Sequence, residues 1–297
     1  MEKLRLFFEQ LRQSAETFLR LLLISKWRKV IRKQNNRRLI VLGNGPSLHS
    51  SVESLGDSIS NADLMCVNFY PATEDYERLK PAYFITSAPE LWRDGVDDFY
   101  IDFRLKIFNA IAEKTTWPLE VFIAWEAKKF PFWISILSKN PNIKITYYNI
   151  LPAEGFPFFR QWMFDRQLGM PRPHNVLVPS IMMAMQKGYS DIILLGADHS
   201  WLPQISVDNH NNVLVNQKHF YDANSSKPET MKKLGKGQRK LHEVLWKFAH
   251  TFESYFIILR YAEDRNVRII NASPDSFIDA FERMGSPELK QFLSGKH

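Results

Sequence analysis

Polar side chains able to bind or activate a substrate follow several short apolar segments of this 297-residue chain. Asn44 and Asn68 lie at the ends of two such segments, and Asp198 follows the apolar segment 192–195. If these segments are parallel strands, their carboxyl ends meet at one edge of a sheet, where open α/β proteins bind ligands. An asparagine amide donates and accepts hydrogen bonds without adding negative charge, which suits a phosphate, a ribose or a base. The pattern therefore predicts a nucleotide site at this edge.

A glycine-flanked turn surrounds Asn44. Gly43 and Gly45 permit a sharp change of direction after a strand and the close approach of a ligand. Ser47 can cap the helix that follows, whose free N–H groups favour a phosphate. The spacing matches neither the dinucleotide fingerprint nor the lysine-bearing phosphate loop. We predict that Gly43, Asn44, Gly45 and Ser47 hold a nucleotide, and the alternative is an ordinary tight turn between a strand and a helix.

His219 is the candidate general base. A hydroxyl that attacks an anomeric carbon must lose its proton, and imidazole, with an ordinary pKa of about 6.5, can accept it at neutral pH. His219 lies in the polar segment 203–236, which we expect to be a long surface loop acting as a lid. For His199 and His210 a structural role is favoured.

Asp198 is a further catalytic candidate. A carboxylate after a central strand can bind Mg²⁺ in front of nucleotide phosphates, with Asp222 or Asp208 as companions. The sequence has no conspicuous acidic pair and no lysine in the glycine turn. We therefore expect a transfer that requires no metal and no cofactor besides the nucleotide-sugar donor, with Mg²⁺-dependent phosphoryl transfer as the alternative.

Three stretches resemble the family 42 bacterial sialyltransferases in sequence and order. They are Gly43–Leu48, Met65–Tyr70 and Lys187–Asp198, and the segment His219–Asp222 follows them. The same stretches are similar to a wider group of Rossmann-like proteins, which includes flagellin-modifying motility accessory factors and archaeal hydroxymethylpterin pyrophosphokinases. The resemblance covers residues 37–280 in patches and implies a Rossmann-like fold with a nucleotide-bound substrate.

The resemblance also implies roles for single residues. In those sialyltransferases, asparagines at the places of Asn44 and Asn68 contact the cytidine nucleotide and the sugar, and Ser273 lies near the place where the cytosine is held. A lid histidine is the base, which corresponds to His219. Tyrosines help the leaving phosphate to depart, a role that falls to Tyr221.

The composition indicates a globular enzyme. The chain is 45% hydrophobic and has 22 Phe, enough for one core of about 250 residues and an appendage. Its single cysteine, Cys66, excludes an intrachain disulfide and suits a reducing cytosol. Alternating strand-like and helix-like segments predict an α/β fold with a Rossmann-like, mostly parallel sheet and helices on both faces. We expect strands at 39–42, 62–68, 83–86, 121–124, 143–147, 192–195 and 267–271, and helices at 99–112, 179–187 and 237–264.

We divide the chain into a basic amphipathic helical arm, residues 1–36, and a catalytic domain, residues 37–297. Within the domain, the segment 125–174 is rich in aromatic residues and proline, so we expect an insertion beside the sheet. It forms either a wall that binds the acceptor or a second hydrophobic cluster.

The arm concentrates the positive charge. Residues 1–38 hold eleven Lys and Arg against three Glu, a net charge of +8, while the whole chain carries +7. Apolar residues recur at helical spacing from Leu4 to Leu23, which predicts one apolar stripe. Such a helix suits the surface of an anionic bilayer. The alternatives are packing on the protein itself or on a second copy in a homo-oligomer. We expect no nucleic acid as a partner, because the basic residues do not spread onto the main domain.

The sequence predicts an inverting, sialyltransferase-like glycosyltransferase. It would use a CMP-linked sugar to extend a lipid-linked or cell-surface glycan, as in polysaccharide biosynthesis. No apolar stretch has the length of a transmembrane helix, and the N-terminus lacks the layout of a cleavable signal peptide. We expect a cytoplasmic protein that is peripheral on the inner face of the cytoplasmic membrane. The alternatives are a Mg²⁺-dependent pyrophosphokinase and a noncatalytic nucleotide-sugar-binding assembly protein.

Overall fold

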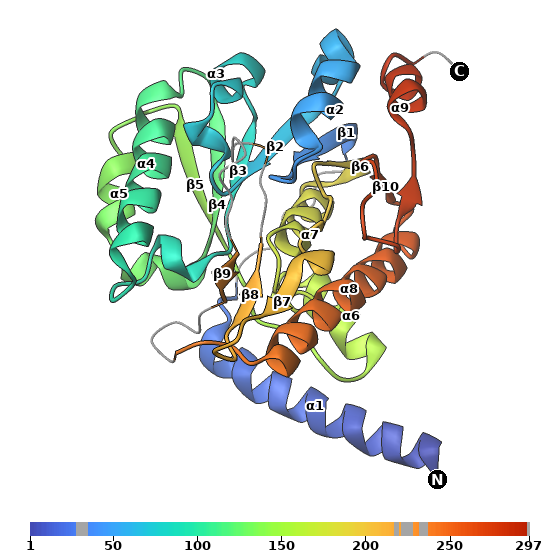
Figure 1. Cartoon of the computed structure of the whole chain (residues 1–297). Coiled ribbons are helices and arrows are strands. Elements are labelled where there is room, and N and C mark those ends of the chain that lie inside the picture. The colour runs from blue at the N-terminus through green and yellow to red at the C-terminus, as the bar shows by residue number, and fades with distance from the viewer. Residues whose placement is uncertain (28–34, 217–219, 221–227, 232–236, 296–297) are drawn as a thin grey trace.

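The computed structural model describes residues 1–27, 35–216, 220, 228–231 and 237–295. Its centre is a sheet of eight parallel strands in the order β11-β10-β6-β1-β2-β3-β4-β5 (Figure 1). The strands are β1 (Asn35–Leu42), β2 (Asp63–Val67), β3 (Tyr83–Ile85), β4 (Leu119–Ala124), β5 (Ile143–Tyr148), β6 (Tyr189–Leu195), β10 (Arg268–Asn271) and β11 (Glu282–Arg283).

β1 lies inside the sheet because its side chains are apolar on both faces. Its residues 39–42 are fully buried, and β1 pairs with β2 on one side and β6 on the other. The strands β2 to β5 extend in one direction from β1, whereas β6, β10 and β11 extend in the other. The strand order therefore reverses between β1 and β6. In open α/β sheets, the crevice beyond the carboxyl ends at such a point is where ligands bind.

Helices cover both faces of the sheet. In Figure 1, α4 and α5 lie on one side of the strands, and α7 and α8 lie on the other. The predicted α/β, Rossmann-like architecture is confirmed, and each predicted strand and helix is present with ends shifted by a few residues. The helices of the domain are α2 (Leu48–Leu55), α3 (Asp75–Leu79), α4 (Asp98–Lys114), α5 (Phe132–Leu137), α6 (Pro157–Asp165), α7 (Leu177–Lys187), α8 (Leu241–Glu263) and α9 (Ser286–Leu293).

The described part of segment 203–236 contains a small antiparallel sheet, so the prediction of a long surface loop is wrong there. The sheet consists of β7 (Ile205–Val207), β8 (Val213–Val215) and β9 (Glu229–Thr230). Val213 and Val215 pack with Val244 and Phe248 of α8 in a separate hydrophobic cluster. Strands this short carry too few apolar residues to show alternation in the sequence.

The segment 125–174 is only partly an insertion. It contains β5, which is an edge strand of the main sheet. Trp133 is fully buried and lies against Phe108 and Tyr147, within the main core. Phe156 and Trp162 instead contact aromatic residues of the N-terminal arm.

The arm forms α1 (Glu2–Ile24), which attaches to the domain through polar contacts and through Leu21, a fully buried member of the main core. The hydroxyls of Ser14 and Thr17 accept backbone hydrogen bonds from the segment 154–156 at 3.0 and 3.3 Å. Gly155 permits this contact, because a Cβ atom there would lie 2.0 Å from Ser14 Oγ. The predicted boundary at residue 36 falls inside β1, which begins at Asn35.

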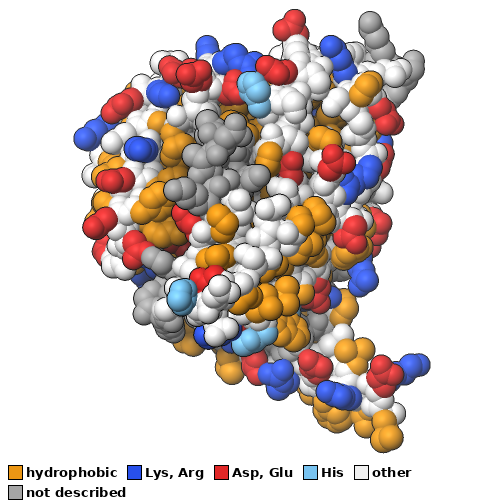
Figure 2. All heavy atoms as spheres, viewed as in Figure 1, with side chains coloured by type: hydrophobic (Ala, Val, Ile, Leu, Met, Phe, Trp, Pro, Cys, Tyr) orange, Lys and Arg blue, Asp and Glu red, His pale blue; other side chains and the backbone are white. Residues whose placement is uncertain are grey.

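Most of the apolar stripe of α1 is exposed. Figure 2 shows hydrophobic side chains along the underside of the projecting helix, with charged side chains along its other edge. The domain therefore covers little of this stripe, and the contact that it makes is the one between the rings of Phe7 and Phe156, 5.4 Å apart. Among the described helices, none combines the length and apolar content needed to cross a bilayer. The stripe consists of Leu4, Phe7, Phe8, Leu11, Phe18, Leu19, Leu22 and Leu23, which are 46–83% exposed.

Candidate functional site

A cavity of about 960 Å³ lies at the carboxyl edge of the main sheet. Small-molecule sites have volumes of roughly 300–1,000 Å³, so this cavity is large enough for a nucleotide sugar. The small antiparallel sheet and α8 also contribute to its wall. Each of the first six strands supplies at least one lining residue just beyond its carboxyl end: Gly43, Asn68, Ser87, Glu126, Ile150 and Gly196.

Gly43 and Gly45 allow the segments after β1 and β6 to pass close to each other. A Cβ atom at position 43 would lie 2.4 Å from Gly196 O, and one at position 45 would lie 1.9 Å from Asp198 Oδ2. The Gly45 N–H donates to Gly196 O at 2.8 Å. Both glycines line the cavity, but their first requirement is this backbone packing rather than the approach of a ligand.

Asn44 and Asn68 lie in the wall of the same cavity. Asn44 donates from Nδ2 to Val67 O at 3.3 Å, and its Oδ1 is buried with no hydrogen-bond partner among the described residues. Asn68 accepts a hydrogen bond from Thr86 Oγ1 at 3.1 Å through its Oδ1. Its backbone is left-handed, with φ 48°, a conformation that asparagine tolerates better than most residues. The site therefore offers an acceptor from Asn44 and amide donors from Asn68.

Asp198 binds the start of α2. Its Oδ1 accepts the Ser47 N–H at 3.1 Å, and the Ser47 side chain makes no capping hydrogen bond. Burial raises the pKa of Asp198, and hydrogen bonds from Ser47 oppose this. Neither residue is among those that line the cavity. The Asp198 carboxylate thus accepts the hydrogen bond of the Ser47 N–H, at the helix start that was predicted to favour a phosphate.

Ser273 lies beside the site as part of its supporting structure. It is 2% exposed, and its Oγ accepts the Ala197 N–H at 2.8 Å and donates to Leu194 O at 3.3 Å. The hydroxyl joins the end of β6 to the segment after β10. Ser273 does not line the cavity, and a contact with a base stays a prediction.

The proposed base, His219, and Tyr221 lie outside the described residues. Phe220, which stands between them in the sequence, donates its N–H to Asn44 O at 3.1 Å. Its ring lies 5.8 Å from that of Tyr70. The chain at Phe220 is therefore attached to the glycine turn. The catalytic roles of His219 and Tyr221 stay predictions.

From the sequence, His199 is expected at the edge of the site, after the buried strand, with a structural role. His199 lines the cavity from the segment after β6, with φ 53° and a ring that is 6% exposed. Its Nε2 lies 2.7 Å from Tyr255 Oη. Burial lowers the pKa of His199 to about 3, so the ring is neutral at pH 7. The apolar positions of α8 indicated a buried face, but they could not identify which loop packs on it.

The cavity also contains basic residues that the sequence did not single out. Lys247 of α8, Arg239 and His174 all line it, as does Glu90. The phenylalanine, tyrosine and tryptophan side chains of segment 125–174, which is described throughout, do not line it. They therefore form no acceptor-binding wall of this cavity, and Trp133 packs in the main core.

The described residues contain no group of three His, Cys, Asp or Glu side chains placed to share a metal ion. Asp208, considered with Asp198, accepts hydrogen bonds from its own turn instead, among them one from Asn212 Nδ2 at 2.9 Å. Asp222 lies outside the described residues.

Comparisons with known proteins give limited information. No protein-family model matches the chain, and no curated protein sequence matches it. One solved structure similar to it is the MAf glycosyltransferase from Magnetospirillum magneticum AMB-1, with a TM-score of 0.49 and 12% sequence identity. The match covers 92% of this chain and 38% of that protein, so this chain spans less than half of its length. Membership of the sialyltransferase family stays a prediction.

Proposed function

We propose that this chain is a glycosyltransferase that moves a sugar from a nucleotide-activated donor, most simply a CMP-linked sugar, to a hydroxyl of a glycan. The observation that carries the proposal is the position of the cavity. It collects the segments after β1 to β6 at the point where strand order reverses. The resemblance of the glycine turn, which contains Asn44, and of the segment Met65–Tyr70, which contains Asn68, to sialyltransferases supports cytidine as the base.

The two asparagines would hold the donor. The free Oδ1 of Asn44 needs a hydrogen-bond donor, which a ribose hydroxyl or an exocyclic amine supplies. The Nδ2 of Asn68 can donate to a ribose, sugar or phosphate oxygen. An unmatched buried acceptor costs about 1–3 kcal/mol, so a ligand that satisfies Asn44 gains affinity.

The transfer would proceed by one displacement. The acceptor oxygen attacks the anomeric carbon and forms the new glycosidic bond. The bond from that carbon to the donor phosphate oxygen breaks, and its electron pair stays on the phosphate. His219 takes the proton of the attacking hydroxyl, and Tyr221 donates a hydrogen bond to the leaving phosphate. Attack opposite the leaving group inverts the anomeric carbon.

Thermal unfolding of the full chain with CMP, CDP, UDP, GDP and ATP, each with and without Mg²⁺, tests the donor class. A ligand present at 100 times its Kd stabilises the folded state by about 2.7 kcal/mol. We expect stabilisation by CMP without Mg²⁺. Stabilisation by ATP only with Mg²⁺ would instead support phosphoryl transfer, and no response to any nucleotide would refute the site.

Asn68→Asp has a matched control in Asn266→Asp. Both asparagines have left-handed backbones, with φ 48° and 53°, and Asn266 is exposed and outside the cavity. The carboxylate in Asn68→Asp would repel a phosphate and remove the amide donors. We expect CMP affinity to fall about tenfold or more in Asn68→Asp and to stay unchanged in Asn266→Asp.

His219→Ala tests the base. We expect transfer or donor hydrolysis to fall by roughly 10²–10⁴, because general-base catalysis contributes about that factor. His210→Ala is the matched control on an exposed histidine of the same segment. CMP binding that persists without turnover on any acceptor, in the wild-type chain, would favour a noncatalytic binding protein.

We also propose that α1 attaches the protein to an anionic membrane surface. The stripe presents eight exposed large apolar side chains on one side of the helix. The charge of residues 1–38, +8, complements anionic headgroups. Most of these basic residues follow α1 in the sequence, and an apolar helix face next to a basic segment suits the interface of an anionic bilayer. The protein would then act at the inner face of the cytoplasmic membrane on a lipid-linked or cell-surface glycan.

Leu19→Glu tests this attachment, with Leu6→Glu as its control. Leu19 and Leu6 are 62% and 54% exposed, but Leu6 lies on the opposite side of α1 at 100° per residue. We expect sedimentation with anionic vesicles to be lost in Leu19→Glu and retained in Leu6→Glu, and to weaken at high salt. A dimer that dissociates in Leu19→Glu, without vesicle binding by the wild type, would instead assign the stripe to a second copy.

A further inference from the structure

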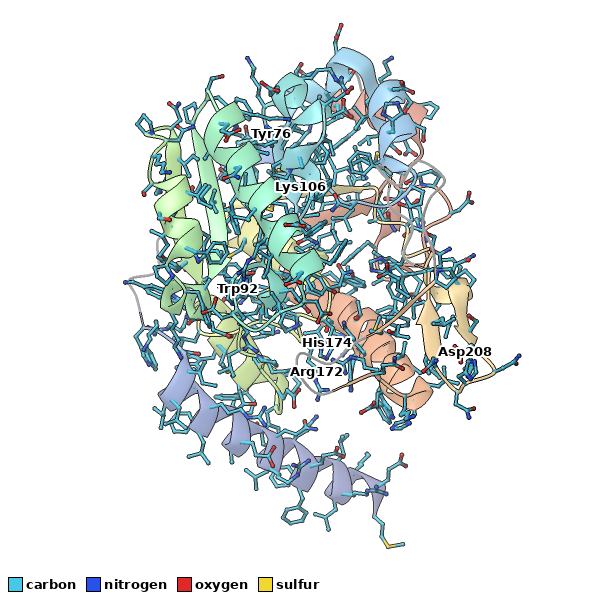
Figure 3. All side chains as sticks on the ribbon, turned by 60° about the vertical axis from the view of Figure 1, so that its left-hand side comes forward. Tyr76, Trp92, Lys106, Arg172, His174 and Asp208 are labelled. Atoms are coloured by element: carbon cyan, nitrogen blue, oxygen red, sulfur yellow. The ribbon has the colours of Figure 1, made fainter. Side chains whose placement is uncertain are left out.

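Three basic side chains from separate segments meet in the cavity. Lys247 comes from the second turn of α8, Arg239 from the segment before α8, and His174 from the loop before α7. All three line the cavity. In Figure 3, the labelled His174 and Arg172 lie beside α8, with Trp92 on the side of α4. The His174 ring lies 6.2 Å from that of His250, which is also on α8.

Lys247 and Arg239 bring two positive charges to this part of the cavity. Burial lowers the pKa of Lys247, and the charge of Arg239 lowers it further, while Glu90 opposes the shift. Desolvation and neighbouring cations together lower the pKa of His174 to about 4. The cations that act on it are Lys247, Arg172, His250 and Arg239.

Nearby acids do not neutralise the group. Arg172 pairs with Glu154, and His250 Nδ1 lies 3.1 Å from Glu253 Oε2, so those two acids are already engaged. Glu90 and Glu229 line the cavity, but no described acid lies within the 4.0 Å ion-pair distance of Lys247 or Arg239.

Lys247 and Arg239 are also partly withdrawn from water. Both are half-buried, and Arg239 Nε is buried with no hydrogen-bond partner among the residues that the structure describes. A desolvated cation without a partner costs free energy, which an anionic ligand would recover.

We propose that Lys247, Arg239 and His174 form an anion subsite of this cavity, which binds a carboxylate or phosphate group of a substrate. Lys247 and Arg239 supply the charge, and His174 at the exposed rim supplies a hydrogen bond. This proposal rests on the function proposed above in one respect, which is that the bound anion belongs to a sugar donor or to an acceptor. It names the substrate class more closely, as one that carries an acidic group beside the cytidine.

Calorimetric titration of the full chain tests the subsite with inorganic phosphate and with N-acetylneuraminate, a sugar carboxylate. A hydrogen bond to a charged group contributes about 1.5–3 kcal/mol, or roughly 10- to 100-fold in affinity. We expect the affinity for both anions to fall by this factor in Lys247→Gln and to be restored in Lys247→Arg. Arg260→Gln, an exposed cation on the same helix, is the matched control and should bind as the wild type does. No binding of either anion to the wild type, or unchanged affinity in Lys247→Gln, would overturn the proposal.

Cytidine and CMP separate this proposal from the function that it builds on. Cytidine has no phosphate, so its affinity should depend on Asn68 and not on Lys247. Unchanged binding of cytidine to Lys247→Gln would also show that this variant is folded. If cytidine fails to bind but phosphate binding depends on Lys247, the glycosyltransferase proposal fails and the subsite stands. Competition between CMP and N-acetylneuraminate would assign the subsite to the nucleotide phosphate, whereas simultaneous binding would assign it to the sugar acid.

Discussion

Replacing His199 with asparagine should remove a measurable part of the acid sensitivity of this protein. His199 is 6% exposed, its Nε2 lies 2.7 Å from Tyr255 Oη, and its ring lies 5.0 Å from that of Trp201. Burial holds the pKa of His199 at about 3 in the folded state. Asparagine cannot titrate in this range, and it tolerates the left-handed backbone at this position, where φ is 53°.

The expected size follows from proton linkage. In the unfolded chain, a histidine with a pKa of about 6.5 is about one-quarter protonated at pH 7 and almost fully protonated at pH 5. The folded His199 stays neutral over this range, so only the unfolded state gains protons. The neutral His199 therefore contributes its full share to the free energy of unfolding above pH 6.5, and this contribution is lost as the pH falls toward 3. Between pH 7 and pH 5 the loss due to His199 is about 2 kcal/mol.

Urea unfolding followed by tryptophan fluorescence at pH 7 and pH 5 measures this loss. Asparagine leaves space beside Tyr255 and lowers the stability at both pH values, so the change with pH within each variant is compared. We expect the wild type to lose about 2 kcal/mol more than His199→Asn between these pH values. His210→Asn, at an exposed position, should behave as the wild type does. Equal losses in the wild type and His199→Asn would show that the folded imidazole is already hydrated or protonated at pH 5.

Two further predictions concern the glycine turn after β1 and the anion subsite. Gly45→Ala should lower the free energy of unfolding by at least about 1–3 kcal/mol, because its Cβ would lie 1.9 Å from Asp198 Oδ2; Gly285→Ala, whose Cβ meets nothing closer than 3.8 Å, is the control in the same urea assay. Sulfate keeps its charge between pH 5 and pH 8, and a bound anion should raise the pKa of His174 from about 4. Calorimetric affinity for sulfate should therefore increase as the pH falls toward 5, and a similar increase in His174→Asn would contradict this role.

The strands at the centre of the fold could be predicted because burial on both faces requires apolar side chains at every position. The segments 39–42 and 192–195 satisfy this requirement, and both are buried throughout in the structure. β11 has only two residues, Glu282 and Arg283, and both are exposed. No pattern distinguishes such a strand from a loop, since its place depends on pairing with β10.

Some residues of the candidate site could likewise be predicted from the sequence, and others could not. Asn44 and Asn68 follow strands that the sequence identifies, so their meeting in one cavity could be predicted from the geometry of a parallel sheet. The positions of Lys247 and Arg239 could not. Lys247 lies in a helix whose apolar spacing indicates only that one side is buried, and Arg239 lies in a polar segment. Whether either side chain enters the cavity depends on how α8 packs against the sheet.

The attachment of α1 has a consequence for the acceptor. α1 is anchored at the carboxyl edge of the main sheet, because Lys26 N–H donates to Asn149 Oδ1 at 2.9 Å directly after β5. The next residue, Ile150, lines the cavity. The exposed stripe and the cavity therefore belong to the same end of the domain. If the stripe lies in a bilayer interface, the cavity is held near the headgroups, where a lipid-linked acceptor presents its hydroxyl and its own phosphate. A soluble acceptor would gain nothing from this arrangement, which is why a membrane-borne glycan is the acceptor that the two proposals jointly favour.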